Sequence, residues 1–173
     1  MLMVKFHIGA SAEADEASYK ASEFSLVYRH RPEVHVHASR LADRIDATLG
    51  IRRDADFLVI ADTLVIVFSR ESRELVGFDA YTNQERWRTS TDIALPDISG
   101  VGKVCLLDSL PEGRLDLCVI PTYAYSDAQR LLEISLDRVP EGAEYYRVSN
   151  QLVVGVRSGM LTSLLVQGLR TVS

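Results

Sequence analysis

The sequence predicts an α+β domain in which an N-terminal helical hairpin packs on a mainly antiparallel, meandering sheet of about eight or nine strands. Three observations favour this class. Apolar residues recur at helical spacing over about 12–29 and 33–49, the period changes to two from residue 56 onward, and short turn-rich links separate the later apolar runs. We interpret the chain 1–173 as one domain, with a helical segment over 1–51 and a β-rich segment over 56–173 whose sheet forms a sandwich or an open barrel.

Composition narrows the class of partner. The 173 residues are 47% hydrophobic and 25% charged, as in ordinary soluble globular chains. The net charge of -5 and the scattered basic residues disfavour nucleic acid, which needs clustered Lys and Arg. No run approaches the roughly 18–20 apolar residues that a bilayer requires. The N-terminus lacks the pattern of a signal peptide, so we expect a cytoplasmic protein with reduced thiols and no membrane partner.

The first predicted helix, about 12–29, begins at Ser11, whose hydroxyl can cap the free amides of the first turn. One face is narrow and built mostly of small residues at spacings of three and four: Ala14, Ala17, Ala21, Phe24 and Tyr28. Pro32 fits the first position of the second helix, about 33–49, and Gly50 fits its C-terminal cap. The short link predicts antiparallel neighbours.

The β-rich segment is organised around the stretch 57–79. Two apolar strands flank Asp62-Thr63, and a charged turn leads to a third strand. Because Leu64-Val-Ile-Val-Phe68 is apolar on both faces, its strand is expected to be covered on both faces. A weaker copy follows near the end of the chain, which predicts an internal repeat between 56–80 and 144–166, either as a duplication or as independent hairpins.

The segment between these copies predicts a hairpin of Lys103–Leu110 with Arg114–Ile120. One register of this hairpin places Cys105 opposite Cys118, and the other places them on opposite faces. Inert core thiols are the favoured interpretation in either case. The following segment, 121–129, is predicted to be a loop.

Residues 77–87, Gly-Phe-Asp-Ala-Tyr-Thr-Asn-Gln-Glu-Arg-Trp, resemble the end of one blade in quinoprotein-type β-propellers. In that family a strand ending in Leu-Asp-Ala leads through a Thr-Gly turn to a strand carrying Trp, and here Asn83 stands where the family has glycine. The likeness covers about a dozen residues of a fold that needs many blades. We therefore interpret it as a β-turn-β solution reached independently, and no cofactor is predicted from it.

Two sets of residues are candidates for chemistry. His35 and His37 would share one face of a strand and suit zinc, but on the predicted helix they point about 200° apart, so no metal site is favoured. Asp79, Asp108 and Asp116 lie in or near predicted strands and form a cleft only if the fold brings them together. A hydrolase or lyase with an Asp/His cleft, with or without a metal ion, is the alternative function that these residues define.

The leading hypothesis is a non-catalytic binding or assembly module. Its site is predicted on an aromatic-lined loop surface, since aromatic rings with a polar tip are common in recognition sites. The predicted ligand- or partner-binding residues are Trp87, Tyr123, Tyr125 and Asp79. The partner is an unidentified protein or small molecule, and self-association is expected. A carrier of a small apolar ligand is a further alternative.

Overall fold

The computed structural model describes residues 2–11, 15–30, 56–91, 93–108, 113–137 and 142–172. Strands make up 63% of these residues and helical turns 5%, and none of their helices reaches seven residues. The α+β prediction with an N-terminal helical hairpin is therefore wrong, and the described chain is nearly all β. The predicted second helix, about 33–49, lies outside the described residues together with His35 and His37.

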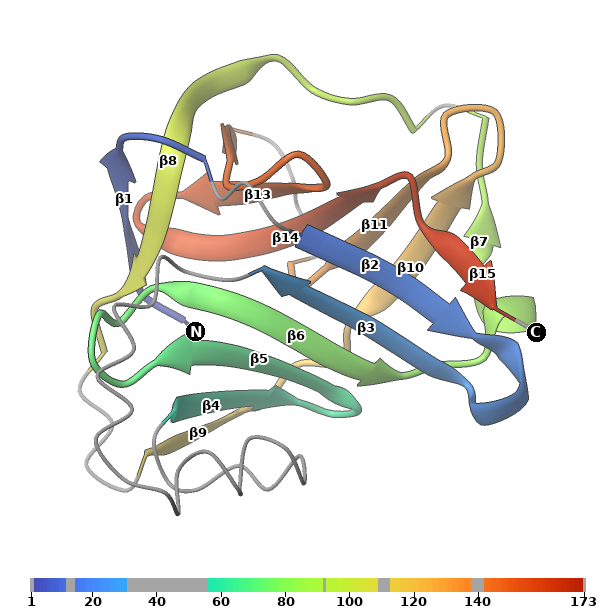
Figure 1. Ribbon diagram of the computed structural model, residues 1–173, viewed down its shortest axis with the longest axis horizontal. Helices are drawn as coiled ribbons and strands as arrows, with labels where there is room; N and C mark the ends of the chain where they lie inside the picture. The colour runs from blue at the N-terminus through green and yellow to red at the C-terminus, as the bar shows by residue number, and fades with distance from the viewer. Residues whose placement is uncertain are drawn as a thin grey trace.

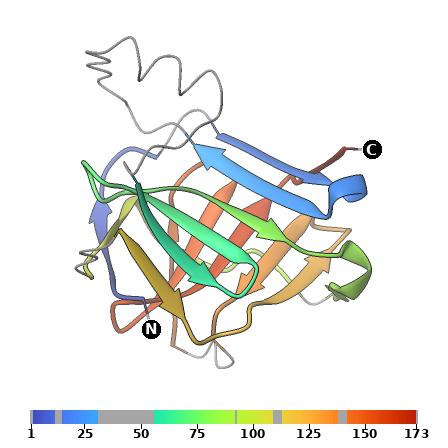
Figure 2. The same ribbon diagram turned by 90° about the horizontal axis from the view of Figure 1, so that it is seen from below.

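The strands form two mixed sheets that face each other, as the two perpendicular views show (Figure 1, Figure 2). The eight-stranded sheet contains, in spatial order, β1 (Val4–Ile8), β8 (Ile98–Leu106), β12 (Glu144–Arg147), β13 (Leu152–Arg157), β14 (Met160–Gln167), β11 (Leu131–Ser135), β10 (Thr122–Ser126) and β7 (Arg88–Thr89). The seven-stranded sheet contains β15 (Arg170–Val172), β2 (Asp15–Lys20), β3 (Ser25–His30), β6 (Leu75–Tyr81), β5 (Leu64–Ser69), β4 (Asp56–Ala61) and β9 (Arg114–Leu117). Two short 3-10 turns are η1 (Ala21–Glu23) and η2 (Gln84–Arg86).

The main core lies between the sheets. It is built from alternate residues of both, such as Tyr28 and Phe78 on one side and Leu152 and Leu164 on the other. A smaller core on the outer face of the eight-stranded sheet includes Ile93, which comes from the segment linking β7 to β8. Because this segment crosses the outer face, the middle strands of that sheet are covered on both sides.

The predicted first helix is instead the hairpin β2–β3. Its buried residues alternate with a period of two: Ala17 and Tyr19 on β2, then Leu26 and Tyr28 on β3, each at most 1% exposed. The alanine spacing also fits a helical stripe, but pairing of β3 with β6 buries both tyrosines in the core. Burial of large aromatic side chains outweighs the weak local propensity of the alanines.

The predicted hairpin of Lys103–Leu110 with Arg114–Ile120 is also wrong. β8 pairs with β1 and β12, whereas β9 pairs in parallel with β4 in the other sheet. Cys105 therefore lies on β8 of the eight-stranded sheet, whereas Cys118 directly follows β9 of the seven-stranded sheet. Both are free thiols. Burial raises the pKa of the half-buried Cys105, with Glu74 adding to the rise.

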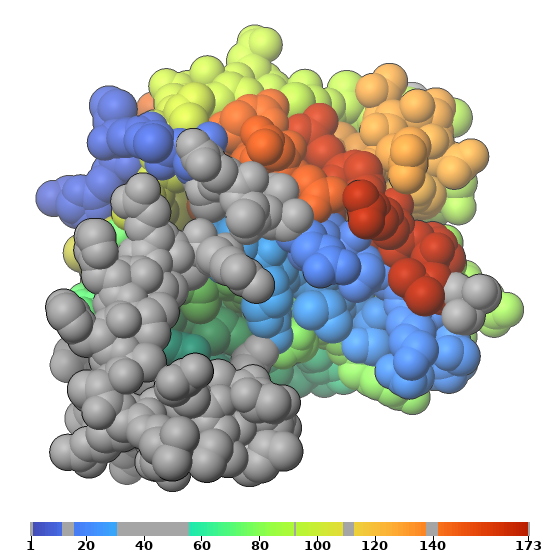
Figure 3. All heavy atoms as spheres, viewed as in Figure 1, coloured from blue at the N-terminus to red at the C-terminus, as the bar shows by residue number. Residues whose placement is uncertain are grey.

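The two sheets share one strand plan. In the seven-stranded sheet the hairpin β2–β3 lies beside the meander β4–β5–β6, with β3 next to β6. In the eight-stranded sheet the hairpin β10–β11 lies beside the meander β12–β13–β14, with β11 next to β14. We call the strands β2 to β7 the first half and the strands β10 to β15 the second half. The last strand of each half belongs to the sheet of the other half: β7 pairs in parallel with β10, and β15 pairs in parallel with β2. Figure 3 shows β15, in red, against the blue N-terminal strands.

The correspondence extends to register. The exchanged strands both carry Arg-Thr, with Arg88 opposite Ala124 and Arg170 opposite Ser18. Each meander has an irregularity at the equivalent place, after Val67 in β5 and after Gly155 in β13. The predicted repeat segments 56–80 and 144–166 are these two meanders, and a duplication as their origin stays a prediction.

Equivalent turns also share their hydrogen bonds. Phe24 and Arg130 both adopt the left-handed backbone conformation, with φ of 52° and 48°. The amide of Phe24 donates to Ala21, as that of Arg130 does to Asp127. The Phe24 carbonyl accepts from the Thr82 amide, which follows β6. The Arg130 carbonyl accepts from the Gly168 amide, which follows β14. Because these features align the two halves residue by residue, each half serves as an internal control for the other.

Candidate binding groove

A groove of about 1210 Å³ opens where the β4–β5 turn, the end of β6 and the start of β10 meet. Its lining from these elements includes Asp62, Thr63, Tyr81, Thr122 and Tyr123. The groove continues onto the outer face of β10 and β11, where Glu133 and Ser135 line it. It therefore joins one end of the molecule to the outer face of the eight-stranded sheet.

Three large apolar side chains stand at the mouth of this groove. Phe24 is 38% exposed, Tyr81 is 63% exposed and Ile120 is 77% exposed. Phe24 and Tyr81 meet edge to face with ring centroids 6.0 Å apart. Exposed apolar side chains scattered singly are ordinary, but a group of them at the mouth of one groove is typical of an interaction surface.

Phe24 is held at the mouth by its backbone. A bulky residue in the left-handed region is uncommon and costs about 1–3 kcal/mol, which the surrounding structure has to offset. Here the Thr82 amide donates to the Phe24 carbonyl at 2.8 Å, and the Phe24 amide donates to Ala21. The strained conformation places the Phe24 ring beside Tyr81 rather than in the core.

Behind the floor lies an aromatic cluster, defined here as Tyr19, Trp87, Tyr123 and Tyr125. The Trp87 ring is central, with centroids 4.9 Å from Tyr19, 6.4 Å from Tyr123 and 6.0 Å from Tyr125. The Trp87 indole is buried and donates to the Thr82 hydroxyl at 2.9 Å. The predicted residues Trp87, Tyr123 and Tyr125 are thus brought together, but only Tyr123 lines the groove, and both tyrosines lie on a strand rather than a loop.

The Tyr123 hydroxyl is a buried polar group at the groove floor. It has no hydrogen-bond partner of good geometry among the described residues. Burial raises the pKa of Tyr123 to about 12, while neighbouring Thr63 offsets part of the rise and the Asp62 charge adds to it. A buried hydroxyl without a hydrogen bond of good geometry is costly, so a polar group that reached it from the groove would offset that cost.

Asp79, the remaining predicted site residue, lies elsewhere. It is on the outer face of the seven-stranded sheet, where both its carboxylate oxygens accept from Arg29 Nη2 at 2.5–2.6 Å. Arg29 Nη1 also donates to the carbonyls of Tyr28 and Phe78. The geometry is that of an ion pair covering a sheet surface, remote from the aromatic cluster.

The other residues considered for catalysis have separate partners. Asp108 accepts from the Met3 amide at 2.8 Å, and Asp116 pairs with Arg114 on an exposed strand. The Arg114 guanidinium lowers the pKa of Asp116 by hydrogen bonding. In the portion of the chain that the structure describes, no group of three or more His, Cys, Asp or Glu side chains is arranged to hold a metal ion.

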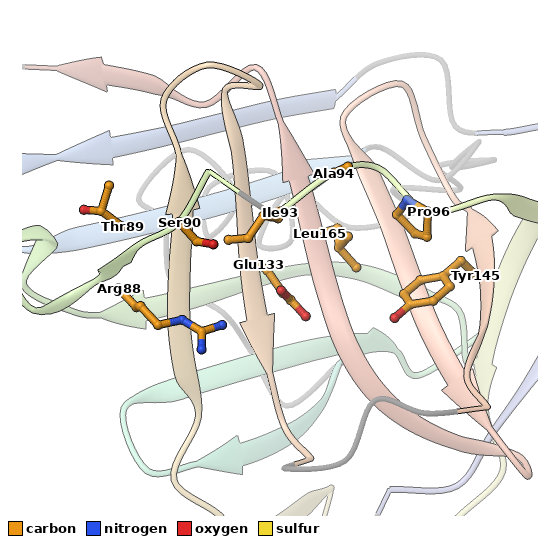
Figure 4. A pocket seen from close by; sticks show the side chains of 9 residues that line it. All are labelled: Arg88, Thr89, Ser90, Ile93, Ala94, Pro96, Glu133, Tyr145 and Leu165. Carbon is orange, nitrogen blue, oxygen red and sulfur yellow. The ribbon is translucent and has the colours of Figure 1, made fainter.

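A second cavity, of about 420 Å³, lies between the outer face of the eight-stranded sheet and the segment that crosses it. We call the described residues of this crossing segment, 90–91 and 93–97, the strap. Figure 4 shows the strap above the strands, with Arg88, Glu133 and Tyr145 beneath it. Arg88 and Glu133 line the groove as well, so the two hollows are neighbours.

Sequence reasoning missed Phe24, Tyr81 and Glu133. The assigned helix hid the turn that exposes Phe24, since a left-handed phenylalanine has no sequence signature. Tyr81 and Glu133 could have been noted as residues at strand ends or on polar faces, but only the pairing of β6 and β11 places them at a hollow.

The fold and groove define the class: a two-sheet β protein whose candidate site is an aromatic-lined groove. No protein-family model matches the chain, and no curated protein matches it. Among the described residues, no helix has the length and apolar character needed to cross a membrane.

Proposed function

We propose that this protein is a non-catalytic binding module that captures an apolar segment of a partner polypeptide in the groove. The observation that carries the proposal is the exposure of Phe24, Tyr81 and Ile120 together at the groove mouth. Tyrosine is enriched among the residues that dominate binding energy at interfaces, and an apolar anchor gains most when it enters a hollow.

The groove also supplies polar contacts for such a segment. The Tyr123 hydroxyl at the floor has no hydrogen-bond partner of good geometry among the described residues, and Arg86 and Asp62 provide charges of both signs nearby. Among the described residues, β7 pairs with Ala124 and Tyr125 of β10, whereas β10 begins at Thr122. A bound extended segment therefore has a strand edge beside it, which favours pairing through backbone hydrogen bonds.

Self-association, and the cytoplasmic location, belong to the same proposal. The four outermost strands of the two sheets are β1, β7, β9 and β15, and outer strands are the usual route to pairing between copies. Light scattering coupled to size-exclusion chromatography measures the mass directly. A mass equal to one chain at every concentration would remove self-association from the proposal without touching the groove.

The groove itself is tested with a display library of random peptides selected on the purified protein. Enriched peptides should contain large apolar residues, and Tyr81→Ala should weaken their binding by about 2 kcal/mol, which is roughly thirtyfold. Ile120→Ala and Ile8→Ala form a matched pair, because both isoleucines are exposed and only Ile120 lines the groove.

Ile120→Ala should weaken peptide binding and Ile8→Ala should leave it unchanged. Two results contradict the proposal: no enrichment of any peptide family, or equal binding by Tyr81→Ala and the parent protein.

A further inference from the structure

The outer strand β1 presents an edge of the eight-stranded sheet. Figure 1 shows it at the margin of that sheet, beyond β8. β1 has five residues, whereas the other outer strands, β7, β9 and β15, have two, four and three. β9 also carries the exposed Arg114–Asp116 ion pair, and charged side chains on an edge oppose pairing with another chain. Among the described outer strands, β1 is therefore the one best suited to such pairing.

The hydrogen bonds of β1 show which of its backbone groups point away from β8. The Gly9 amide donates to the Val101 carbonyl of β8 at 3.0 Å. Residues of an antiparallel ladder alternate in direction, so the odd-numbered residues of β1 bond to β8 and the even-numbered ones point outward. The Val4 amide confirms this direction, because it donates to the Gly159 carbonyl on the outer side at 2.8 Å.

Phe6 and Ile8 are the next two residues whose backbone groups point outward. In the described part of the chain, no hydrogen bond is recorded for these groups on the outer side. Ile8 is 89% exposed, although isoleucine is among the residue types most often buried. On the same face of β1, the partly buried Phe6 ring stacks on Tyr146 with centroids 4.0 Å apart. We call the outward groups of Phe6 and Ile8, with their side chains, the β1 edge.

The β1 edge is complementary to a second copy of itself. Antiparallel pairing that sets Phe6 of one copy opposite Ile8 of the other uses the outward amide and carbonyl of both residues in both copies. The same pairing sets the exposed Ile8 side chain beside the Phe6 ring of the other copy. Cross-strand pairs of an aromatic and a β-branched residue stabilise a sheet. One arrangement therefore satisfies the backbone groups and covers the exposed isoleucine.

Neighbouring registers of the two strands are less favourable. A shift in one direction sets Lys5 opposite His7 and needs the Val4 amide, which already bonds to Gly159. A shift in the other direction needs the backbone of Ala10, which lies beyond the end of β1. The favoured register is therefore symmetric about His7, which faces the same residue of the other copy.

We propose that two copies of this chain associate through the β1 edge, with His7 at the two-fold axis. This inference rests on the self-association included in the proposed function and names the strand and register that carry it. Lys103 stands opposite His7 on β8 and pairs with Glu74, which limits charge repulsion between the copies. The contact is short, so the dimer is of the weak class and forms in proportion to protein concentration.

Sedimentation equilibrium of the full chain, over about 10 µM to about 1 mM, measures the dimer Kd. Ile8→Pro removes an amide that is used only between copies, and proline is tolerated on an edge strand where its missing N–H faces solvent. This variant should weaken the dimer at least about tenfold. Ile120→Ala, at an exposed isoleucine of the groove, is the control and should leave the dimer Kd unchanged.

Cysteine cross-linking tests the register. In a background with Cys105→Ser and Cys118→Ser, oxidised glutathione should link two copies of His7→Cys. Directly opposed residues that are not hydrogen-bonded have Cα atoms about 4.5 Å apart, within the range of about 4.4–6.8 Å that a disulfide needs. Lys5→Cys is the control, because Lys5 faces Gly9 of the other copy. Its two Cα atoms are about 14 Å apart, so it should not cross-link.

Three results would overturn the proposal: a mass of one chain at every concentration, an unchanged dimer Kd in Ile8→Pro, or equal cross-linking of His7→Cys and Lys5→Cys. The first also removes self-association from the proposed function, whereas the other two leave association through another surface. Peptide binding in the groove is separate and should be the same in Ile8→Pro and the parent protein. If Ile8→Pro does not fold, the cysteine pair still decides, because His7 and Lys5 are both exposed.

Discussion

Two tyrosine-to-phenylalanine substitutions test the core and the groove floor together. The Tyr28 hydroxyl lies 2.7 Å from Ser149 Oγ and 3.0 Å from His30 Nδ1, in a wholly buried position. The Tyr123 hydroxyl is buried as well, but lacks a partner of good geometry among the described residues. The substitutions remove the same atom from two environments that differ in hydrogen bonding.

Tyr28→Phe should lower the free energy of unfolding by about 2–3 kcal/mol. Each buried hydrogen bond contributes about 0.5–1.5 kcal/mol net, and a buried group left without its partner costs about 1–3 kcal/mol. In the variant the Ser149 Oγ still accepts a hydrogen bond from the Leu152 amide, so it is left only partly unsatisfied. The expected loss of unfolding free energy therefore lies toward the lower end of the sum of these contributions. For a chain of this size the midpoint of thermal unfolding should fall by about 4–12 °C.

Tyr123→Phe should change the free energy of unfolding by less than about 0.5 kcal/mol, or raise it, because the removed hydroxyl gives up no good hydrogen bond. Urea unfolding with unchanged slope measures both values. Equal losses for the two variants would refute the distinction between the satisfied and the unsatisfied hydroxyl. If Tyr123 serves the groove, Tyr123→Phe should weaken peptide binding while leaving stability intact.

Three further outcomes are expected. Gly102→Ala should cost about 1–3 kcal/mol in urea unfolding, since its Cβ would lie 2.0 Å from a main-chain oxygen of β1, while Gly9→Ala meets nothing within 4 Å and should be close to neutral. In ultraviolet titration Tyr123 should ionise with a pKa of about 12, which is above the value of about 10 in the unfolded chain. The contribution of this difference to the free energy of unfolding is therefore complete below pH 10 and is lost as the pH rises to about 12. Tyr123→Phe should abolish this fall in stability. Exposed Cys118 should react with a maleimide faster than Cys105, whose pKa is raised by burial; equal rates would contradict this.

The strands with the clearest period of two were predictable from the sequence. β4 and β5 match the apolar runs around Asp62-Thr63, and β6 follows the charged turn as expected. Local patterning was sufficient there because each strand pairs with its neighbour in the chain. The apolar run Leu64–Phe68 forms an interior strand of its sheet, between β6 and β4, as its two apolar faces indicate.

Pairing between distant segments was not predictable. The parallel partners of β7, β9 and β15 come from opposite halves of the chain, and no local signal specifies them. The hairpin β2–β3 was missed for a related reason. Its alternation of Ala17, Tyr19, Leu26 and Tyr28 competes with a helical spacing, and only the contact with β6 decides between them.

The candidate site shows the same division. Trp87, Tyr123 and Tyr125 were singled out by residue type, and strand pairing brings their rings together. Asp79 was singled out with them, but its face of β6 belongs to the Arg29 ion pair. Residue type identified aromatic groups suited to recognition, whereas the face on which each one lies depends on the sheet.

The shared strand plan separates what the fold needs from what it does not. A side chain that both halves keep is accounted for by the architecture they share, while one that only a single half carries needs a reason of its own. Tyr123 corresponds to Ala17, and Glu133 corresponds to Val27. In each pair the strand forms with a smaller or an apolar residue at the same position of the sheet. The polar groups of the eight-stranded half are therefore dispensable for pairing. Glu133→Val, which places the counterpart residue at a position that lines the groove, should preserve the fold and weaken peptide binding in the groove.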